Sequence, residues 1–126
     1  MGKRKILLVD DDREYVEATT LLLEHSGYEV VAAFDGPDGL AKAKREGPDV
    51  ILLDVMMSKT TEGFEVLNEL RREPETRNTP VMMLTGVSTH FPGSKLDTDQ
   101  LPAEMFVEKP VRPGQLLSKI EKLLEG

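Results

Sequence analysis

The stretch Ile6-Leu7-Leu8-Val9-Asp10-Asp11-Asp12 places four apolar residues directly before three acids. A run of four consecutive apolar positions is too short for a buried helix and is typical of a strand covered on both faces. Strands of this kind belong to parallel sheets that carry helices on each side. The stretch therefore predicts a buried parallel strand with an acidic cluster at its carboxyl end.

Short apolar runs of the same kind recur along the chain, each followed by a polar turn and then, as a rule, by a segment of helical periodicity. These further runs are Val30–Phe34, Val50–Leu53, Val81–Leu84 and Met105–Val107. Strands that alternate with helices over short connections form a doubly wound fold with right-handed crossovers. The expected fold class is therefore α/β, with a doubly wound five-stranded parallel sheet.

The predicted helices are bounded by residues that commonly start or stop a helix. Asp12 suits the N-cap of the first helix, which ends at Ser26-Gly27, where Gly27 can adopt the left-handed conformation. The second helix opens at Gly36-Pro37 and stops at Gly47-Pro48. A third runs over about 62–72, and a one-sided leucine stripe predicts a last helix over 116–124. The turn at Asp35-Gly36 has the composition of an ordinary turn.

The segment 87–102 interrupts this alternation. It contains Pro92-Gly93, Pro102 and few apolar residues, so the helix expected between the fourth and fifth strands is predicted to be short or irregular.

Length and composition limit the possible functions. The 126 residues fit a single domain, 1–126, and the absence of cysteine excludes disulfides and thiolate metal sites. The net charge of −7 disfavours direct binding to nucleic acid or to anionic lipid. The apolar runs are far too short for a membrane span. These features predict a cytoplasmic protein without a membrane segment.

Polar side chains follow the predicted strands at the edge where ligands bind in doubly wound folds. Asp10 and Asp11 follow the first strand, Asp54 the third, Thr85 the fourth and Lys109 the fifth. Several carboxylates in one place disfavour one another's charge unless a cation is present, and carboxylate oxygens suit Mg²⁺ or Mn²⁺. With a cation bound, Lys109 and the Thr85 hydroxyl could stabilise a phosphoryl group under attack by a carboxylate.

At these positions the sequence resembles the response-regulator receiver domains of the chemotaxis-regulator type. The resemblance rests on Val9-Asp10-Asp11, Leu53-Asp54, Leu84-Thr85-Gly86 and Lys109-Pro110, and it extends from Lys5 to about Leu124. It implies a flavodoxin-like fold with strand order 2-1-3-4-5. It also implies two-component signalling, in which a sensor histidine kinase or a histidine phosphotransfer protein donates a phosphoryl group.

The resemblance also implies a role for each matching residue. Asp54 would be the phosphoryl acceptor, and Asp10, Asp11, Asp54 and the backbone carbonyl of Met56 would hold Mg²⁺. Thr85 would move onto the new phosphoryl group, Lys109 would supply its counter-charge, and Phe106 would be the aromatic switch that alters a partner-binding face. Such a protein catalyses its own phosphorylation but has no turnover substrate, so we do not expect a conventional enzyme.

This sequence departs from the family pattern beside the acceptor. The family usually has Pro four residues and Gly eight residues after the acceptor, where this chain has Ser58 and Glu62, so the loop over 57–62 is predicted to be one residue longer than usual. Met56 and Val87 flank the expected path of the attacking water. Apolar side chains cannot orient a water molecule, which predicts slow self-dephosphorylation.

Two other functions are compatible with parts of the pattern. A pseudo-receiver would bind partners without phosphorylation, although the complete set of acids argues against it. A phosphatase of the haloacid-dehalogenase type also uses an Asp after a strand, but it needs a second Asp two residues later, where this chain has Met56.

Overall fold

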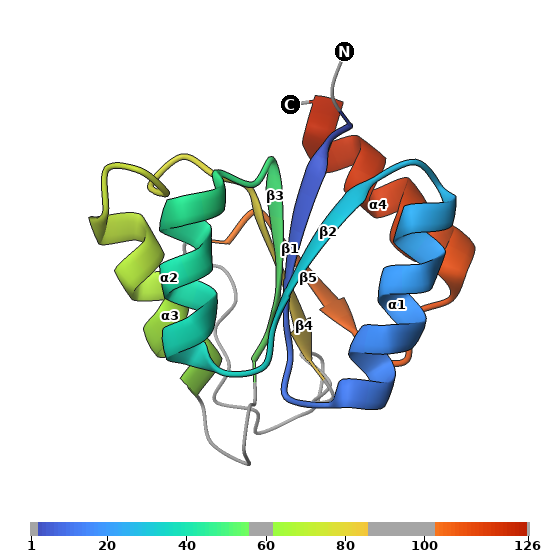
Figure 1. The fold of residues 1–126 in the computed structure, drawn as a ribbon, viewed down its shortest axis with the longest axis horizontal. Coiled ribbons are helices and arrows are strands. Elements are labelled where there is room, and N and C mark those ends of the chain that lie inside the picture. Colours follow the sequence, from blue (N-terminus) through green and yellow to red (C-terminus); the bar gives the residue numbers. More distant parts are fainter. Residues whose placement is uncertain (1–2, 56–61, 86–102, 126) are drawn as a thin grey trace, which may run out of the picture.

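The computed structural model describes residues 3–55, 62–85 and 103–125 of the chain, and Figure 1 shows its fold. The strands are β1 (Lys5–Val9), β2 (Glu29–Ala33), β3 (Val50–Asp54), β4 (Val81–Thr85) and β5 (Met105–Glu108). Within these residues the helices are α1 (Arg13–His25), α2 (Gly36–Glu46), α3 (Glu62–Arg72) and α4 (Pro113–Glu125).

The strands form one parallel sheet in the order β2-β1-β3-β4-β5. This is the order that the resemblance implied, and the α/β fold class is confirmed with it. Because every strand is parallel, all carboxyl ends lie at the same edge, the lower one in Figure 1. Asp54 is paired with Leu84, and Thr85 with Glu108, in the last rungs of the sheet at that edge.

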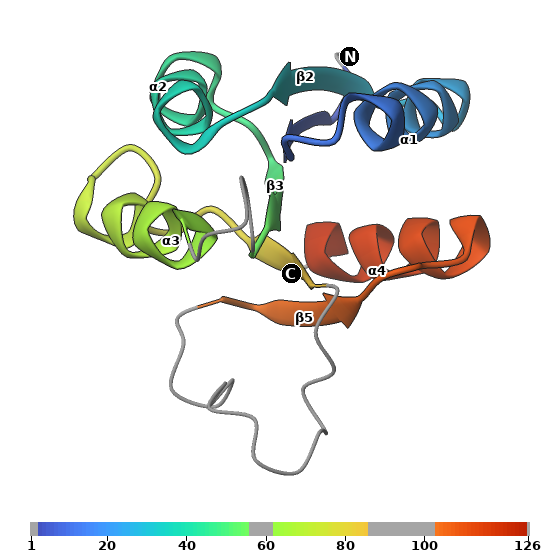
Figure 2. The same ribbon diagram turned by 90° about the horizontal axis from the view of Figure 1, so that it is seen from below.

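Helices cover both faces of the sheet. Figure 2 shows α1 and α4 on one side and α2 and α3 on the other. Successive residues of β1 divide between these layers: Ile6 and Leu8 pack under α1 and α4, whereas Leu7 and Val9 pack under α2 and α3. The apolar run therefore contributes to two cores, and each fully buried Leu or Ile stabilises the fold by roughly 1.5–3 kcal/mol.

Burial separates the central strands from the edges of the sheet. Every residue of β3 and β4 is buried, and so is β1 apart from Lys5. The edge strands β2 and β5 are only partly buried, so the expectation of cover on both faces holds best for the three central strands. Phe34, placed in the second strand by its apolar character, lies one residue beyond β2.

The helix boundaries follow capping chemistry. The Asp12 carboxylate accepts a hydrogen bond from the Tyr15 N–H at 3.2 Å, which confirms the predicted N-cap of α1. Asp35 does the same for α2, accepting from the Asp38 N–H at 2.8 Å, a capping role that was not assigned to this turn from the sequence. Gly27, at φ 98°, has the left-handed conformation that its position after α1 predicted.

Some expectations fall outside the residues that the structure describes. The short or irregular helix over 87–102 lies there, as does most of the predicted 57–62 loop. In the described part of the chain, no helix combines the length and the apolar composition that crossing a membrane requires.

Candidate functional site

Three carboxylates meet at the carboxyl edge of the sheet. One oxygen each from Asp10, Asp11 and Asp54 lies within 4.8 Å of the other two. Asp10 is fully buried and Asp54 is only 6% exposed, whereas Asp11 is exposed. Two of the carboxylates are therefore buried and the third faces solvent. The sequence predicted that these acids would converge at this edge, but not which of them would be buried.

Backbone hydrogen bonds fix the position of Asp10. Its N–H donates to the carbonyl of Ala33 at 3.0 Å, which extends the pairing of β1 with β2 by one residue. Its carboxylate accepts a hydrogen bond from the Asp12 N–H at 3.0 Å. The acid at the end of β1 is therefore held by the same turn that starts α1.

Lys109 supplies the positive charge of the site. Its Nζ lies 2.6 Å from Oδ2 of Asp10 and 3.8 Å from Oδ1 of Asp54. Its backbone N–H donates a hydrogen bond to the carbonyl of Thr85 at 2.7 Å. Burial works to lower the pKa of Lys109, but the hydrogen bond and charge of Asp10, together with the charge of Asp54, outweigh it and raise that pKa above its ordinary value. The side chain is therefore an ammonium ion at neutral pH.

Thr85 and Phe106 lie on the face of the sheet that α2 and α3 cover. Thr85 is buried at the end of β4, and Phe106 is partly buried against the core under α2 and α3. Phe106 pairs with Met83, two residues before Thr85, so the alternation of the strands puts the two side chains on one face at neighbouring positions. This arrangement is compatible with the switch pair that the resemblance implied.

The acidic cluster fits a small divalent cation. Ligand oxygens lie about 2.1 Å from Mg²⁺, so two on opposite sides of the ion are about 4.2 Å apart. All three pairs of oxygens lie within 4.8 Å, which is only slightly wider, so a small side-chain rotation covers the difference. The donor set is entirely carboxylate oxygen, which suits Mg²⁺ or Mn²⁺ and disfavours soft metals.

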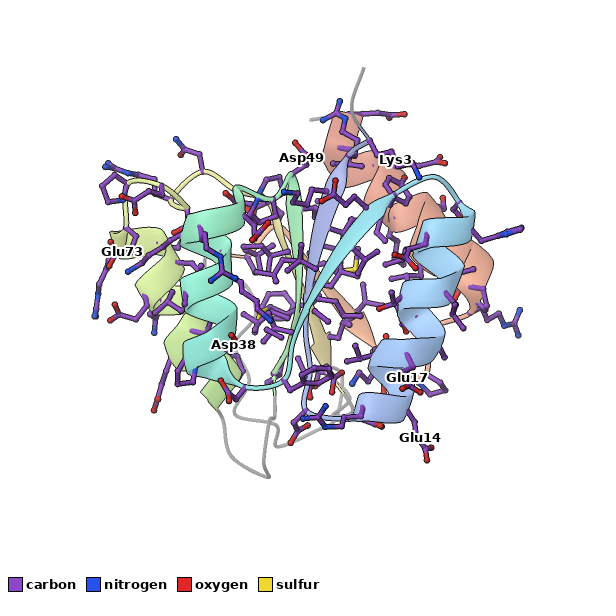
Figure 3. All side chains as sticks on the ribbon, in the orientation of Figure 1. Lys3, Glu14, Glu17, Asp38, Asp49 and Glu73 are labelled. Atoms are coloured by element: carbon purple, nitrogen blue, oxygen red, sulfur yellow. The ribbon has the colours of Figure 1, made fainter. Side chains whose placement is uncertain are left out.

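Other acids near α1 do not belong to the cluster. Figure 3 shows Glu14 and Glu17 pointing from α1 into solvent, and both side chains are exposed. In the described residues, Asp10, Asp11 and Asp54 form the group whose oxygens approach closely enough to share an ion.

Two neighbours of the site were given no role from the sequence. The ring of Tyr15 faces Lys109, with its centroid 4.3 Å from Nζ. Gly63 approaches the backbone of β3 so closely that a Cβ there would contact the carbonyl of Asp54 and lie 2.7 Å from that of Val55. A tyrosine in the first turn of a helix is common, so Tyr15 did not stand out without the fold. Gly63 was noted as the ninth residue after Asp54, but its close approach to β3 was not predicted.

Two residues that were assigned roles from the sequence lie outside the residues that the structure describes. They are Met56, the expected carbonyl ligand, and Val87, which together with Met56 was expected to flank the path of the attacking water without orienting it. Their predicted roles stay predictions.

Comparison with known proteins places this geometry in a family. The family model "Response regulator receiver domain" matches residues 6–121. The regulatory protein PhoP of Bacillus subtilis, named for alkaline phosphatase synthesis, is 37% identical over 121 residues, which are 96% of this chain and 48% of PhoP. The chain thus spans about half the length of that relative.

Solved structures agree. Chemotaxis protein CheY4 of Vibrio cholerae is 34% identical, with a TM-score of 0.86 over 98% of this chain and all of that one. TrrA of Thermotoga maritima, solved in complex with Mg²⁺ and BeF, is 29% identical, with a TM-score of 0.81 over 96% of this chain and 99% of TrrA. The chain belongs to the response-regulator receiver domain family of two-component signalling.

Proposed function

We propose that this chain accepts a phosphoryl group on Asp54 in a reaction that requires a divalent cation held by Asp10, Asp11 and Asp54. The observation that carries the proposal is the approach of these carboxylates to within 4.8 Å, with an ammonium 3.8 Å from the acceptor. Such a cluster is costly without a cation and becomes useful with one.

The transfer moves phosphorus from nitrogen to oxygen. A carboxylate oxygen of Asp54 forms the new P–O bond while the P–N bond of a phosphohistidine breaks, and its electron pair stays on the imidazole, which takes up a proton. A bound Mg²⁺ would neutralise the carboxylates and draw charge from the phosphoryl oxygens. The partly open side of the cluster, beside exposed Asp11, gives the donor access.

Lys109 and Thr85 stabilise the product in this proposal. The Lys109 ammonium stands beside both Asp10 and Asp54, so a phosphoryl group on Asp54 meets a positive charge already in place. The Thr85 hydroxyl then turns toward the phosphoryl group, and Phe106, on the same face of the sheet, repacks. The outcome is a population shift that alters a partner-binding face.

The partners follow from this chemistry. The donor is a sensor histidine kinase or a histidine phosphotransfer protein in the cytoplasm, and the output is a protein or domain that reads the altered face. The relative PhoP is named a transcriptional regulatory protein and is about twice as long, so an output that acts on DNA is compatible with the family. Direct contact of this acidic domain with nucleic acid is not part of the proposal.

The chain is a switch rather than an enzyme with a turnover substrate. If Met56 and Val87 flank the water path, as the resemblance implies, hydrolysis of the aspartyl phosphate is slow. We expect the phosphorylated protein, freed of donor in the presence of Mg²⁺, to persist for many minutes. A half-life of seconds would refute this part of the proposal.

Intact mass spectrometry tests the acceptor. The protein is incubated with acetyl phosphate and Mg²⁺, and we expect a mass gain of one phosphoryl group that is lost in Asp54→Ala and in the presence of EDTA. A gain that survives the substitution would move the acceptor to another residue. No gain in the wild type, together with no spectral response to beryllofluoride, would favour a pseudo-receiver.

A further inference from the structure

The Lys109 ammonium has a neighbour besides the two carboxylates. Its Nζ lies over the ring of Tyr15, 4.3 Å from the centroid, which is within the range of a cation–π contact. Tyr15 stands in the first turn of α1 and is half-buried, and Lys109 is 22% exposed. The contact is therefore partly shielded from water, where such an attraction is stronger than at a fully exposed site.

The ring and the carboxylates act on the ammonium differently. A carboxylate accepts a hydrogen bond from one N–H of the ammonium, as Asp10 does from Lys109 at 2.6 Å. A ring face attracts the charge as a whole, which leaves the remaining N–H groups for oxygen acceptors. The contact with Tyr15 thus supports the ammonium from one side without competing for the donors that a phosphoryl group on Asp54 would need.

Two hydrogen bonds connect Tyr15 to the acidic cluster. The Tyr15 N–H donates to the carboxylate of Asp12 at 3.2 Å, and the Asp12 N–H donates to the carboxylate of Asp10 at 3.0 Å. The residue that carries the ring is thereby tied to the acid that binds the ammonium. The start of α1 and the end of β1 form one unit around Lys109.

From this geometry we infer that Tyr15 is a positioning residue of the phosphorylation site, whose ring holds the Lys109 ammonium beside Asp54. The inference rests on the proposed function and deepens it. In this role Tyr15 does not touch the phosphoryl group. It reduces the number of positions open to Lys109, so that the positive charge is in place when charge develops on the phosphoryl oxygens.

The test compares variants that distinguish the contribution of the aromatic ring from those of the hydroxyl and of apolar packing. Tyr15→Phe keeps the ring face, whereas Tyr15→Leu keeps an apolar side chain but removes the π system. We expect Tyr15→Leu to lower the phosphorylation rate at saturating acetyl phosphate about fivefold and to weaken beryllofluoride binding by a similar factor. Tyr15→Phe should stay within about twofold of the wild type, and the Mg²⁺ affinity of both variants should be nearly unchanged because the carboxylates remain.

A double-mutant cycle with Lys109→Met identifies the partner of the ring. In the Lys109→Met background, Tyr15→Leu should have no further effect on beryllofluoride affinity. An equal loss in both backgrounds would overturn the inference, and so would an effect of Tyr15→Phe as large as that of Tyr15→Leu. If Tyr15→Leu fails to fold, Tyr15→Met, which fills the space with a flexible chain, takes its place in the cycle.

The outcomes also separate this inference from the proposed function. A wild-type protein that takes up no phosphoryl group refutes the function. A wild-type protein that is phosphorylated on Asp54 while Tyr15→Leu behaves normally refutes the role of Tyr15 alone.

Discussion

Replacing Asp54 by asparagine removes one negative charge from the strand-end cluster and keeps the shape of the side chain. At an effective dielectric constant of about 20, two carboxylate oxygens at the 4.8 Å limit repel by about 3.5 kcal/mol, and Asp54 has two such neighbours. Lys109, at 3.8 Å, attracts it by about 4.4 kcal/mol on the same scale. For these three neighbours at that limit, the sum is a net repulsion of about 2.6 kcal/mol, which falls to about 0.6 kcal/mol at the dielectric constant of water.

We therefore expect Asp54→Asn to stabilise the metal-free protein by about 1 kcal/mol. For a domain of this size, that corresponds to a rise of about 3–6 °C in Tm. Thermal unfolding in EDTA, followed by circular dichroism, measures it.

Mg²⁺ should reverse the order of stability, so that the wild type becomes more stable than Asp54→Asn. Mg²⁺ at ten times its Kd stabilises the wild type by about 1.4 kcal/mol, because the ion binds only the folded site. Asp54→Asn, which has lost one charged ligand, should gain much less. The matched control is Asp12→Asn, which removes the same charge two residues from Asp10, lies outside the cluster and keeps a good N-cap.

Three results would refute this reasoning. Asp54→Asn could have a lower Tm than the wild type in EDTA. Its change in Tm could equal that of Asp12→Asn, or Mg²⁺ could raise its Tm as much as it raises that of the wild type. Each result would mean that repulsion between the carboxylates does not destabilise the metal-free protein, or that a cation does not relieve it.

Three further substitutions test other parts of the structure. Gly63→Ala would press a methyl group against the carbonyl of Asp54, so we expect a loss of about 1–3 kcal/mol in urea unfolding together with slower phosphorylation; normal values of both would contradict the close approach. Hydrogen bonds from Arg45 and Lys5 lower the pKa of Glu46, so its contribution to stability is present above pH 4.5 and is lost as the pH falls below it. Urea midpoints of Glu46→Gln and wild type should thus differ at pH 7 and converge in acid, and a constant difference would count against the contact. Arg71→Met removes the donor that binds the carbonyls after α3, and it should lower the free energy of unfolding by about 1–3 kcal/mol in the same assay. An unchanged urea midpoint would mean that these hydrogen bonds do not contribute to stability.

Much of the fold could be predicted because its determinants are local. The run Ile6–Val9 is apolar at every position since the strand is covered on both faces, and Asp12 is a cap whatever lies around it. The strand-end acids could be predicted with the fold, because parallel strands bring their carboxyl ends to one edge. Asp10, Asp11 and Asp54 needed no knowledge of side-chain packing to be placed together.

The rest depended on how elements pack. Tyr15 contacts Lys109 only because α1 packs on the face of the sheet that carries Met105 and Val107 of β5, which the sequence of α1 alone does not reveal. Asp35 is common in turns as well as in caps, and its role became clear only when the structure showed that α2 begins at Gly36, directly after it. The edge strands β2 and β5 have apolar sequences like those of the central strands, yet they are partly exposed because strand order, not composition, decides which strands are central.

The most direct test of the account is to locate the phosphoryl group. The protein is treated with acetyl phosphate and Mg²⁺, with a parallel sample in EDTA, and proteolytic peptides are analysed by tandem mass spectrometry after reduction of the acyl phosphate with borohydride. The account requires one reduced residue, at Asp54, in the magnesium sample and none in the chelated sample. Modification at Asp10 or Asp11, or labelling of Asp54 that is equal in the two samples, would contradict it.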